Sequence, residues 1–163
     1  MERTIFGDAT AECLDSVVDT PLGRIGALSY WEHAQPLLKY HTYSQREQIH
    51  IAAWSPAFDH DGKSLWSMSR EGTEAIARTY AIESQSFVLH TTVVFSESVI
   101  DQMSTHNDLI MNSPGGGSVV FGPDGRKLST NIPADKKGII YADLDIDDIL
   151  HLHSKVLLNV VGH

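Results

Sequence analysis

The stretch from Pro21 to Trp54 constrains the fold of this chain more than any other. Its first apolar run, which contains two glycines, predicts a buried strand, and Pro36 opens a helix at the first-turn position that proline favours. A second apolar run, Ile49–Trp54, closes the unit. Strand, helix and strand in this order predict a βαβ crossover with two parallel strands. The corner at residues 29–31 then lies at the carboxyl end of a parallel strand, where open α/β sheets bind their ligands.

The rest of the chain continues the alternation of helices and strands, and the fold class predicted is α/β. Residues 1–20 are expected to form a loop that leads into the first strand. No repeat or linker marks a second domain. The elements expected after Trp54 are a helix at Glu71–Gln85, a strand at Phe87–Phe95, a short helix within Ser98–Leu109, a hairpin of Ser118–Phe121 and Arg126–Thr130, a strand at Gly138–Asp143 and a helix from Asp145 to Asn159.

The charge and composition of the sequence limit the kinds of partner that the chain is expected to bind. The formal charge of -9 and the 12 scattered Lys and Arg residues argue against binding to nucleic acid or to an anionic membrane. No apolar run is long enough to span a bilayer, and the first residues lack the pattern of a signal peptide. The single cysteine, Cys13, cannot form an internal disulfide, so a reduced, cytoplasmic setting is expected.

Two motifs that suggest ligand sites have simpler interpretations. The residues Asp59, His60 and Asp61 are adjacent in one loop, and three adjacent side chains seldom converge on a metal ion. The glycines at 115–117 lack the Gly-Lys-Ser/Thr that follows a phosphate-binding loop. The sequence therefore predicts no metal site and no phosphate loop.

The corner lies within a longer recognisable segment. The residues GRIGALSYWEHAQPLLKYH resemble the nucleophile segment of the nitrilases, and most closely the fungal type in which a Cys precedes Trp-Glu-His. The likeness continues through HTYSQREQIHIAAW, FDHDGKSLW, ARTYAIESQSFVLHTT, GGGSVVFGPDGRKLS and a terminal VVGH, and so covers essentially the whole chain. The resemblance implies the carbon-nitrogen hydrolase superfamily and its α-β-β-α sandwich of two stacked sheets.

The resemblance also assigns roles to single positions. Tyr30 stands where the family has its nucleophilic Cys, and Glu2 falls on the family's second glutamate, which orients the substrate. The backbone N–H of Trp31 would contact the developing negative charge. Glu32 and His33 would shape the substrate pocket, although a Glu-His pair at a helix start is also a plausible cap. The family's general-base Glu and its Lys lie upstream of residue 1, so residues 1–163 are expected to be a nitrilase domain without its amino-terminal part.

A tyrosine is a poor replacement for the nucleophile. Its phenol has an ordinary pKa of about 10, and its ring is far larger than a thiol, so Tyr30 is expected to fill the pocket. Ser29 is one residue out of register, so in an alternating strand it points to the other side, and it is expected to be packed or hydrogen-bonded. Cys13 lies outside the motif and is expected to be a small buried hydrophobe rather than a reactive thiol. Histidines 41, 50, 90, 151 and 153 lack metal-ligand spacing and are expected to be structural.

The implied parent reaction converts a small nitrile into a carboxylic acid and ammonia through a Cys thioimidate, without a cofactor. This chain is expected to be catalytically inactive, because the thiol, the general base and the lysine are not in its sequence. A non-catalytic subunit that joins an intact nitrilase is the alternative function, and a decayed product without a role is a third. The partners expected are a nitrile in the parent family and a second copy or an intact nitrilase as assembly partner.

Overall fold

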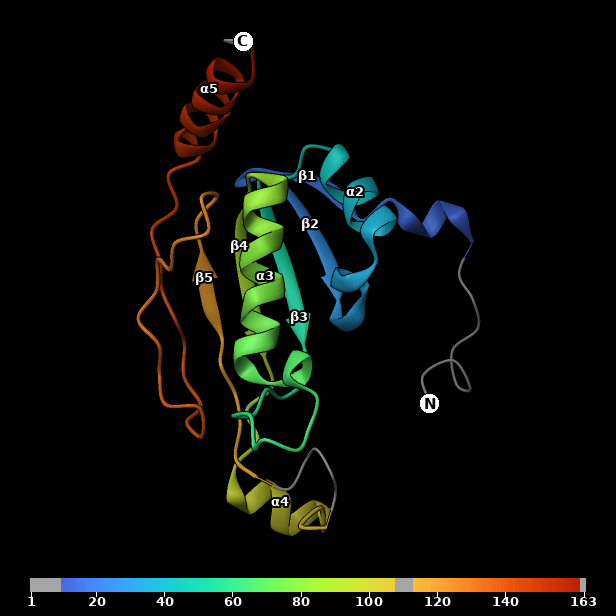
Figure 1. Cartoon of the computed structure of the whole chain (residues 1–163), viewed down its shortest axis with the longest axis vertical. Coiled ribbons are helices and arrows are strands. Elements are labelled where there is room, and N and C mark those ends of the chain that lie inside the picture. Colours follow the sequence, from blue (N-terminus) through green and yellow to red (C-terminus); the bar gives the residue numbers. More distant parts are fainter. Residues whose placement is uncertain (1–9, 108–112, 162–163) are drawn as a thin grey trace.

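The computed structural model describes residues 10–107 and 113–161. At its centre is a five-stranded sheet whose spatial order follows the order of the strands in the chain (Figure 1). The strands are β1 (Val17–Thr20), β2 (Gly23–Ser29), β3 (Ile49–Trp54), β4 (Phe87–Thr92) and β5 (Val119–Phe121). The three central strands are parallel, and β1 and β5 run antiparallel to their neighbours at the two edges.

Helical segments connect the strands. The crossover from β2 to β3 is confirmed, and its helix begins at Pro36, as the sequence predicts. Ser69 caps the long helix before β4 by accepting a hydrogen bond from the Gly72 N–H. The helical segments are η1 (Ala11–Leu14), η2 (Tyr30–Ala34), α2 (Pro36–Ser44), η3 (Trp66–Met68), α3 (Arg70–Ser84), α4 (Glu97–Met103) and α5 (Asp147–Val161). Among the described residues, no helix has the length and apolar character needed to cross a membrane.

One face of the sheet carries the core. Helix α3 lies along this face in Figure 1, with α2 beside it, and both contribute side chains to one apolar cluster. Tyr80 and Ala77 of α3 are completely buried against this face. The buried members contributed by the strands are Leu28, Ala52, Trp54, Val88, Val119 and Phe121.

The opposite face of the sheet is largely open. Ala27, Ile51 and Leu89 are neighbours in register across β2, β3 and β4, and Ala53 lies beside Thr91 one step further along. Ala27, Ala53 and Thr91 are exposed, whereas Ile51 and Leu89 are half-buried. A single sheet with helices on one face has the layers of one half of an α-β-β-α sandwich, so the α/β class predicted from the sequence is confirmed.

Three expectations about local structure need correction. Residues 138–143 form no strand: they run as irregular chain, with Ile139 and Tyr141 exposed. The hairpin after residue 118 is shorter than predicted, because its second side pairs only through the bridge from Phe121 to Lys127. Residues before β2 contain a separate edge strand, β1, rather than a loop alone.

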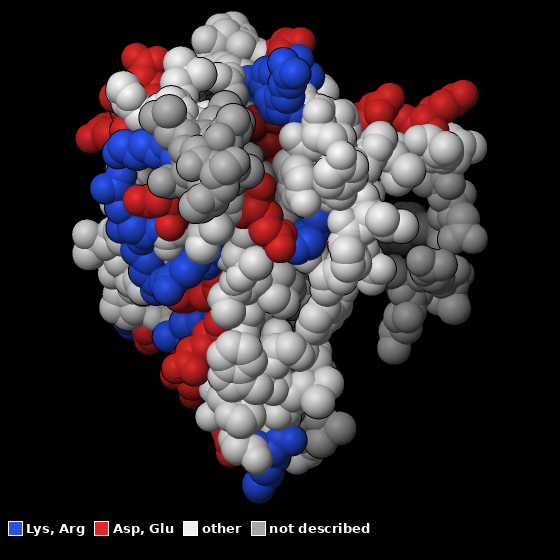
Figure 2. Space-filling view, turned by 45° about the horizontal axis from the view of Figure 1, so that its top comes forward, with Lys and Arg blue, Asp and Glu red and all other residues white. Residues whose placement is uncertain are grey.

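Charged side chains are interspersed on the surface. Figure 2 shows Lys and Arg beside Asp and Glu on the left of the view, while much of the right is uncharged. Arg126 lies 3.2 Å from a carboxylate oxygen of Asp124, and Lys127 lies 2.6 Å from one of Glu74. These basic side chains are therefore already paired with acidic ones.

Candidate functional site

The corner predicted at residues 29–31 is a sharp turn at the end of β2. The strand ends at Ser29, and Tyr30 has a φ of 55°, which lies in the left-handed region of the backbone map. A non-glycine residue in this conformation costs about 1–2 kcal/mol, so the surrounding structure must hold it there. The turn leads directly into η2, whose first residue is Tyr30.

The residues after Tyr30 fix the main chain on both sides of it. A carboxylate oxygen of Glu32, Oε2, accepts a hydrogen bond of 2.6 Å from the Ser29 N–H. The ring of His33 donates through Nδ1 to the Tyr30 carbonyl oxygen at 2.9 Å, because a carbonyl oxygen can only accept. The Glu-His pair thus acts as a cap of η2, which is one of the two interpretations that the sequence left open.

Aromatic rings fill the space beside the corner. The ring centroid of Tyr30 lies 6.0 Å from that of Trp31 and 5.8 Å from that of Trp54, the last residue of β3. The hollow that these rings leave has a volume of about 10 Å³, and Ser55, Pro56, Met68 and Thr73 complete its lining. A cavity of this size holds at most one water molecule. The rings of Tyr30, Trp31 and Trp54 thus occupy most of the space beside the corner.

A continuous chain of buried hydrogen bonds runs from the corner into the core. His33 Nε2 lies 3.0 Å from His50 Nε2, on β3. His50 Nδ1 lies 2.8 Å from Glu47 Oε2, and both of these side chains are fully screened from solvent. The Tyr80 hydroxyl donates to the other carboxylate oxygen of Glu47. The ring of Tyr80 also stacks on His50 with centroids 3.9 Å apart.

Burial determines the protonation states of the two groups at the ends of this hydrogen-bond chain, His33 and Tyr80. Removal from water lowers the pKa of His33 to about 3, against the opposing effect of its hydrogen bond to the Tyr30 carbonyl oxygen, so the ring is neutral at physiological pH. Burial, followed by the charge of Glu47, raises the pKa of Tyr80, whose hydroxyl therefore keeps its proton. Both groups are consequently uncharged hydrogen-bonding partners.

The other residues singled out in the sequence lie apart from this corner. Ser29 is exposed beside Ala53 on the open face of the sheet and is not packed there. The expected burial of Cys13 is wrong, because Cys13 is an exposed free thiol in η1. Glu2 lies outside the described residues. Asp61 binds its own loop by accepting hydrogen bonds from the backbone N–H groups of Lys63 and Ser64. In residues 10–107 and 113–161, no three His, Cys, Asp or Glu side chains are grouped closely enough to hold a metal ion.

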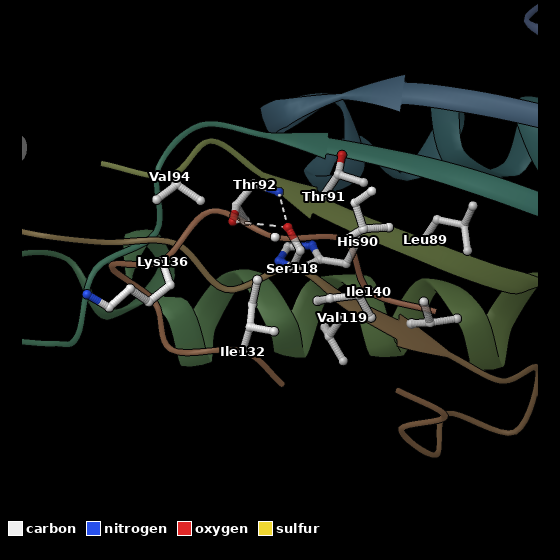
Figure 3. Close-up of a pocket in the computed structure, with 13 residues that line it drawn as sticks. Leu89, His90, Thr91, Thr92, Val94, Ser118, Val119, Ile132, Lys136 and Ile140 are labelled. Carbon is white, nitrogen blue, oxygen red and sulfur yellow. Dashed lines mark hydrogen bonds between the residues drawn. The ribbon is translucent and has the colours of Figure 1, made fainter. Parts of the chain in front are cut away.

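A larger cavity lies away from the corner. It has a volume of about 320 Å³ and is bordered by β4, β5 and the irregular segment 132–140. Figure 3 shows Leu89 and Thr91 of β4, Ile132 and Ile140 of the segment near Val119, and Lys136 at the far left of the view. Ser118 accepts a hydrogen bond of 2.9 Å from the Thr92 N–H at its edge. This cavity continues the open face of the sheet.

The central member of the buried hydrogen-bond chain, Glu47, is not among the residues that the sequence motifs indicate. His50 is expected from the sequence to be an ordinary structural histidine. A usable signal was present in the segment REQIHI, where a carboxylate precedes the His of a buried strand by three residues. Tyr80 gave no such signal, since its contact with Glu47 spans 33 residues of sequence.

The sequence is similar to a known protein family and to curated proteins over most of its length. The family model described as carbon-nitrogen hydrolase matches residues 1–153. An arylacetonitrilase of Aspergillus kawachii is 66% identical over 166 residues, an alignment that covers 100% of this chain and 50% of the relative. An arylacetonitrilase of Aspergillus oryzae is 61% identical over 167 residues with the same coverage. The chain thus spans about half the length of the curated relatives it matches.

Solved structures show the same fold. A carbon-nitrogen hydrolase of Helicobacter pylori superimposes with a TM-score of 0.65 at 22% identity, covering 86% of this chain and 46% of that one. Nit3 of Saccharomyces cerevisiae, a member of branch 10 of the nitrilase superfamily, gives a TM-score of 0.63 at 20% identity, covering 88% and 45%. At these identities the likeness concerns the fold.

Proposed function

Because the chain belongs to the carbon-nitrogen hydrolase family, we propose that it is a catalytically silent nitrilase segment that carries the nucleophile corner of the fold. The observation that carries the proposal is Tyr30, which occupies the left-handed turn after β2 and whose ring fills the adjoining space. A phenol with a pKa near 10 is a weak nucleophile toward a nitrile at neutral pH.

The parent reaction defines what is missing. A Cys thiol adds to the nitrile carbon, forming a carbon–sulfur bond while a proton moves to nitrogen and gives a thioimidate. One water then displaces ammonia, and a second hydrolyses the thioester to the carboxylic acid and the free thiol. The arylacetonitrilase relatives make arylacetonitriles the proposed substrate class of the parent. In that reaction the Trp31 backbone N–H would stabilise the developing negative charge, and Glu2 would orient the substrate.

A second candidate function is that of a non-catalytic assembly partner. The observation that favours it is the open face of the sheet, where Ala27 and Ala53 are exposed beside half-buried Ile51 and Leu89. Apolar sheet faces are normally covered by another layer, and covering this one has a hydrophobic driving force. An intact nitrilase, a second copy or a separate amino-terminal half of the fold would supply that layer.

Fragment complementation tests both candidates. The chain is mixed with the separately expressed amino-terminal half of the Aspergillus kawachii arylacetonitrilase, which is expected to supply the general-base Glu and the Lys. Binding is measured by light scattering, and ammonia release is measured with phenylacetonitrile. We expect the pair to associate and to remain inactive with Tyr30, whereas Tyr30→Cys gives turnover. Tyr30→Ala is the matched control, because it opens the same space without supplying a thiol.

Each outcome bears on a separate part of the proposal. Ammonia release by the unmodified chain would overturn its catalytic silence. Association without turnover in the Tyr30→Cys pair would remove the assignment of residue 30 as the nucleophile position. Absence of association would count against the open face as a docking surface for the missing half.

A further inference from the structure

Glu32 and His33 join the corner at Tyr30 to the buried hydrogen bonds of His50, Glu47 and Tyr80. We propose that Glu32 and His33 are positioning residues that clamp the peptide units on either side of residue 30, and that the Glu47–His50 pair, which shares a single proton, holds His33 in place. The catalytic part of this proposal rests on the proposed function. Its hydrogen-bonding part rests only on the distances between the buried side chains.

The first step is the clamp at the corner. Glu32 accepts from the N–H that precedes residue 30, and His33 donates to the carbonyl oxygen that follows it, at 2.6 and 2.9 Å. These two hydrogen bonds offset the cost of the left-handed conformation at Tyr30, where φ is 55°. Neither contact involves the side chain of residue 30, so the clamp serves any residue at that position, including a nucleophile.

The second step is the direction of each hydrogen bond. Since the Tyr30 carbonyl can only accept, the proton of the neutral His33 ring sits on Nδ1, and His33 Nε2 must accept. The facing Nε2 of His50, 3.0 Å away, must therefore carry a proton and donate. His50 Nδ1 lies 2.8 Å from Glu47 Oε2, and a hydrogen bond between these two atoms requires one further proton.

The third step is the charge balance. If that proton is on His50, an imidazolium faces a carboxylate; if it is on Glu47, both groups are neutral. Either arrangement gives the buried cluster a net charge of zero, because Tyr80 and His33 are uncharged. A cluster without net charge avoids the several kcal/mol that an unpaired buried ion costs. The hydrogen bond from Tyr80 uses the second carboxylate oxygen of Glu47 and ties the cluster to α3.

The decisive measurement reads the proton positions directly. Long-range ¹H–¹⁵N correlation spectra of the imidazole rings are recorded on the full, unmodified chain between pH 5.5 and 8, in solution or by magic-angle spinning for an assembled sample. The His33→Gln variant assigns the signals. We expect a fixed Nδ1–H tautomer at His33 and a protonated Nε2 at His50. An Nε2–H tautomer at His33, or a ring that exchanges freely between tautomers, would overturn the proposal.

Substitutions of Glu47 test whether this residue helps to hold the corner at Tyr30 in place. Glu47→Gln can still accept from Tyr80 and can donate to His50, so the His33 tautomer and the hydrogen-exchange protection of the amides at 31–33 are expected to persist. Glu47→Leu removes both functions, and we expect this protection to fall at least tenfold. Glu97→Leu, at an exposed position of α4, is the matched control. Equal protection in the Glu47→Leu and Glu97→Leu variants would overturn the supporting role of Glu47.

The complemented pair separates this proposal from the proposed function. In an active Tyr30→Cys pair, Glu47→Leu is expected to lower kcat at least tenfold with little change in KM, and Glu47→Gln is expected to restore kcat. A rise in KM without a fall in kcat would assign the buried hydrogen bonds to substrate binding instead. If the Cys pair is inactive, the tautomer measurement on the unmodified chain still decides the hydrogen-bonding proposal.

Discussion

Gly26 lies directly beneath the carboxylate of Glu47, so closely that a Cβ atom at residue 26 would overlap Glu47 Oε2. Gly26 is the register partner of His50 in the parallel pair of β2 and β3. The glycine in β2 therefore creates the space that the buried Glu47–His50 pair occupies. A close approach of this kind is one of the few reasons for a glycine inside a strand.

Gly26→Ala should destabilise the chain. The added methyl group forces Glu47 away from His50 and Tyr80, and overpacking of this kind costs about 1–3 kcal/mol before any lost hydrogen bond is counted. Gly138→Ala is the control, because its Cβ would meet only the end of the Ile132 side chain, at 2.9 Å. Urea unfolding followed by tryptophan fluorescence measures both, and equal midpoints would show that Glu47 adjusts without cost.

Stability should fall as the pH is lowered from about 7 to 4, and His90 should account for part of this fall. Burial, with a smaller contribution from Lys127, lowers the pKa of His90 from 6.5 to about 4. The unfolded chain therefore binds more protons than the folded chain in this range, so acidification favours unfolding, by on the order of 3 kcal/mol at pH 4 for this residue.

His90→Leu tests that assignment. Within the described part of the chain, neither ring nitrogen of His90 has a hydrogen-bond partner, so leucine leaves no partner unpaired. The stability of the variant relative to the parent should increase steadily as the pH falls from 7 to 4.5. His153→Leu, at an exposed position of α5, is the matched control. A His90→Leu offset that does not change with pH would contradict the assignment.

The open face of the sheet should drive association. Ala53→Lys places a charge at the centre of this face, where Ala53 is exposed in β3. We expect the variant to form smaller assemblies than the parent in size-exclusion chromatography with light scattering. Ala75→Lys, on the exposed side of α3, is the control. A compact parent monomer that both variants leave unchanged would show that this face does not recruit other chains.

Tyr30→Cys in the isolated chain should release no ammonia from phenylacetonitrile. A thiol without the general base lacks proton transfer worth about 10²- to 10⁴-fold, and it also lacks the charge stabilisation that the Lys is expected to provide. Ammonia release is followed against a Tyr30→Ala blank. Turnover above that blank would show that this chain carries its own general base.

The sequence by itself determined the elements that depend on neighbouring residues. Pro36 starts α2 because its fixed φ suits the first turn of a helix, and Ile49–Trp54 forms β3 because a short apolar run bounded by polar residues is buried as a strand. The corner at Tyr30 follows from these two elements, since a βαβ crossover places it at the carboxyl end of β2.

The tertiary structure decided what depends on partners distant in the sequence. Residues 138–143 have the composition of a strand but form none, because a strand exists only where another strand completes its hydrogen bonds. Glu47, His50 and Tyr80 converge because β3 and α3 pack together, and His33 joins them from η2. Hydrophobic patterning predicts which residues are buried, but the packing of whole elements determines which buried polar groups meet.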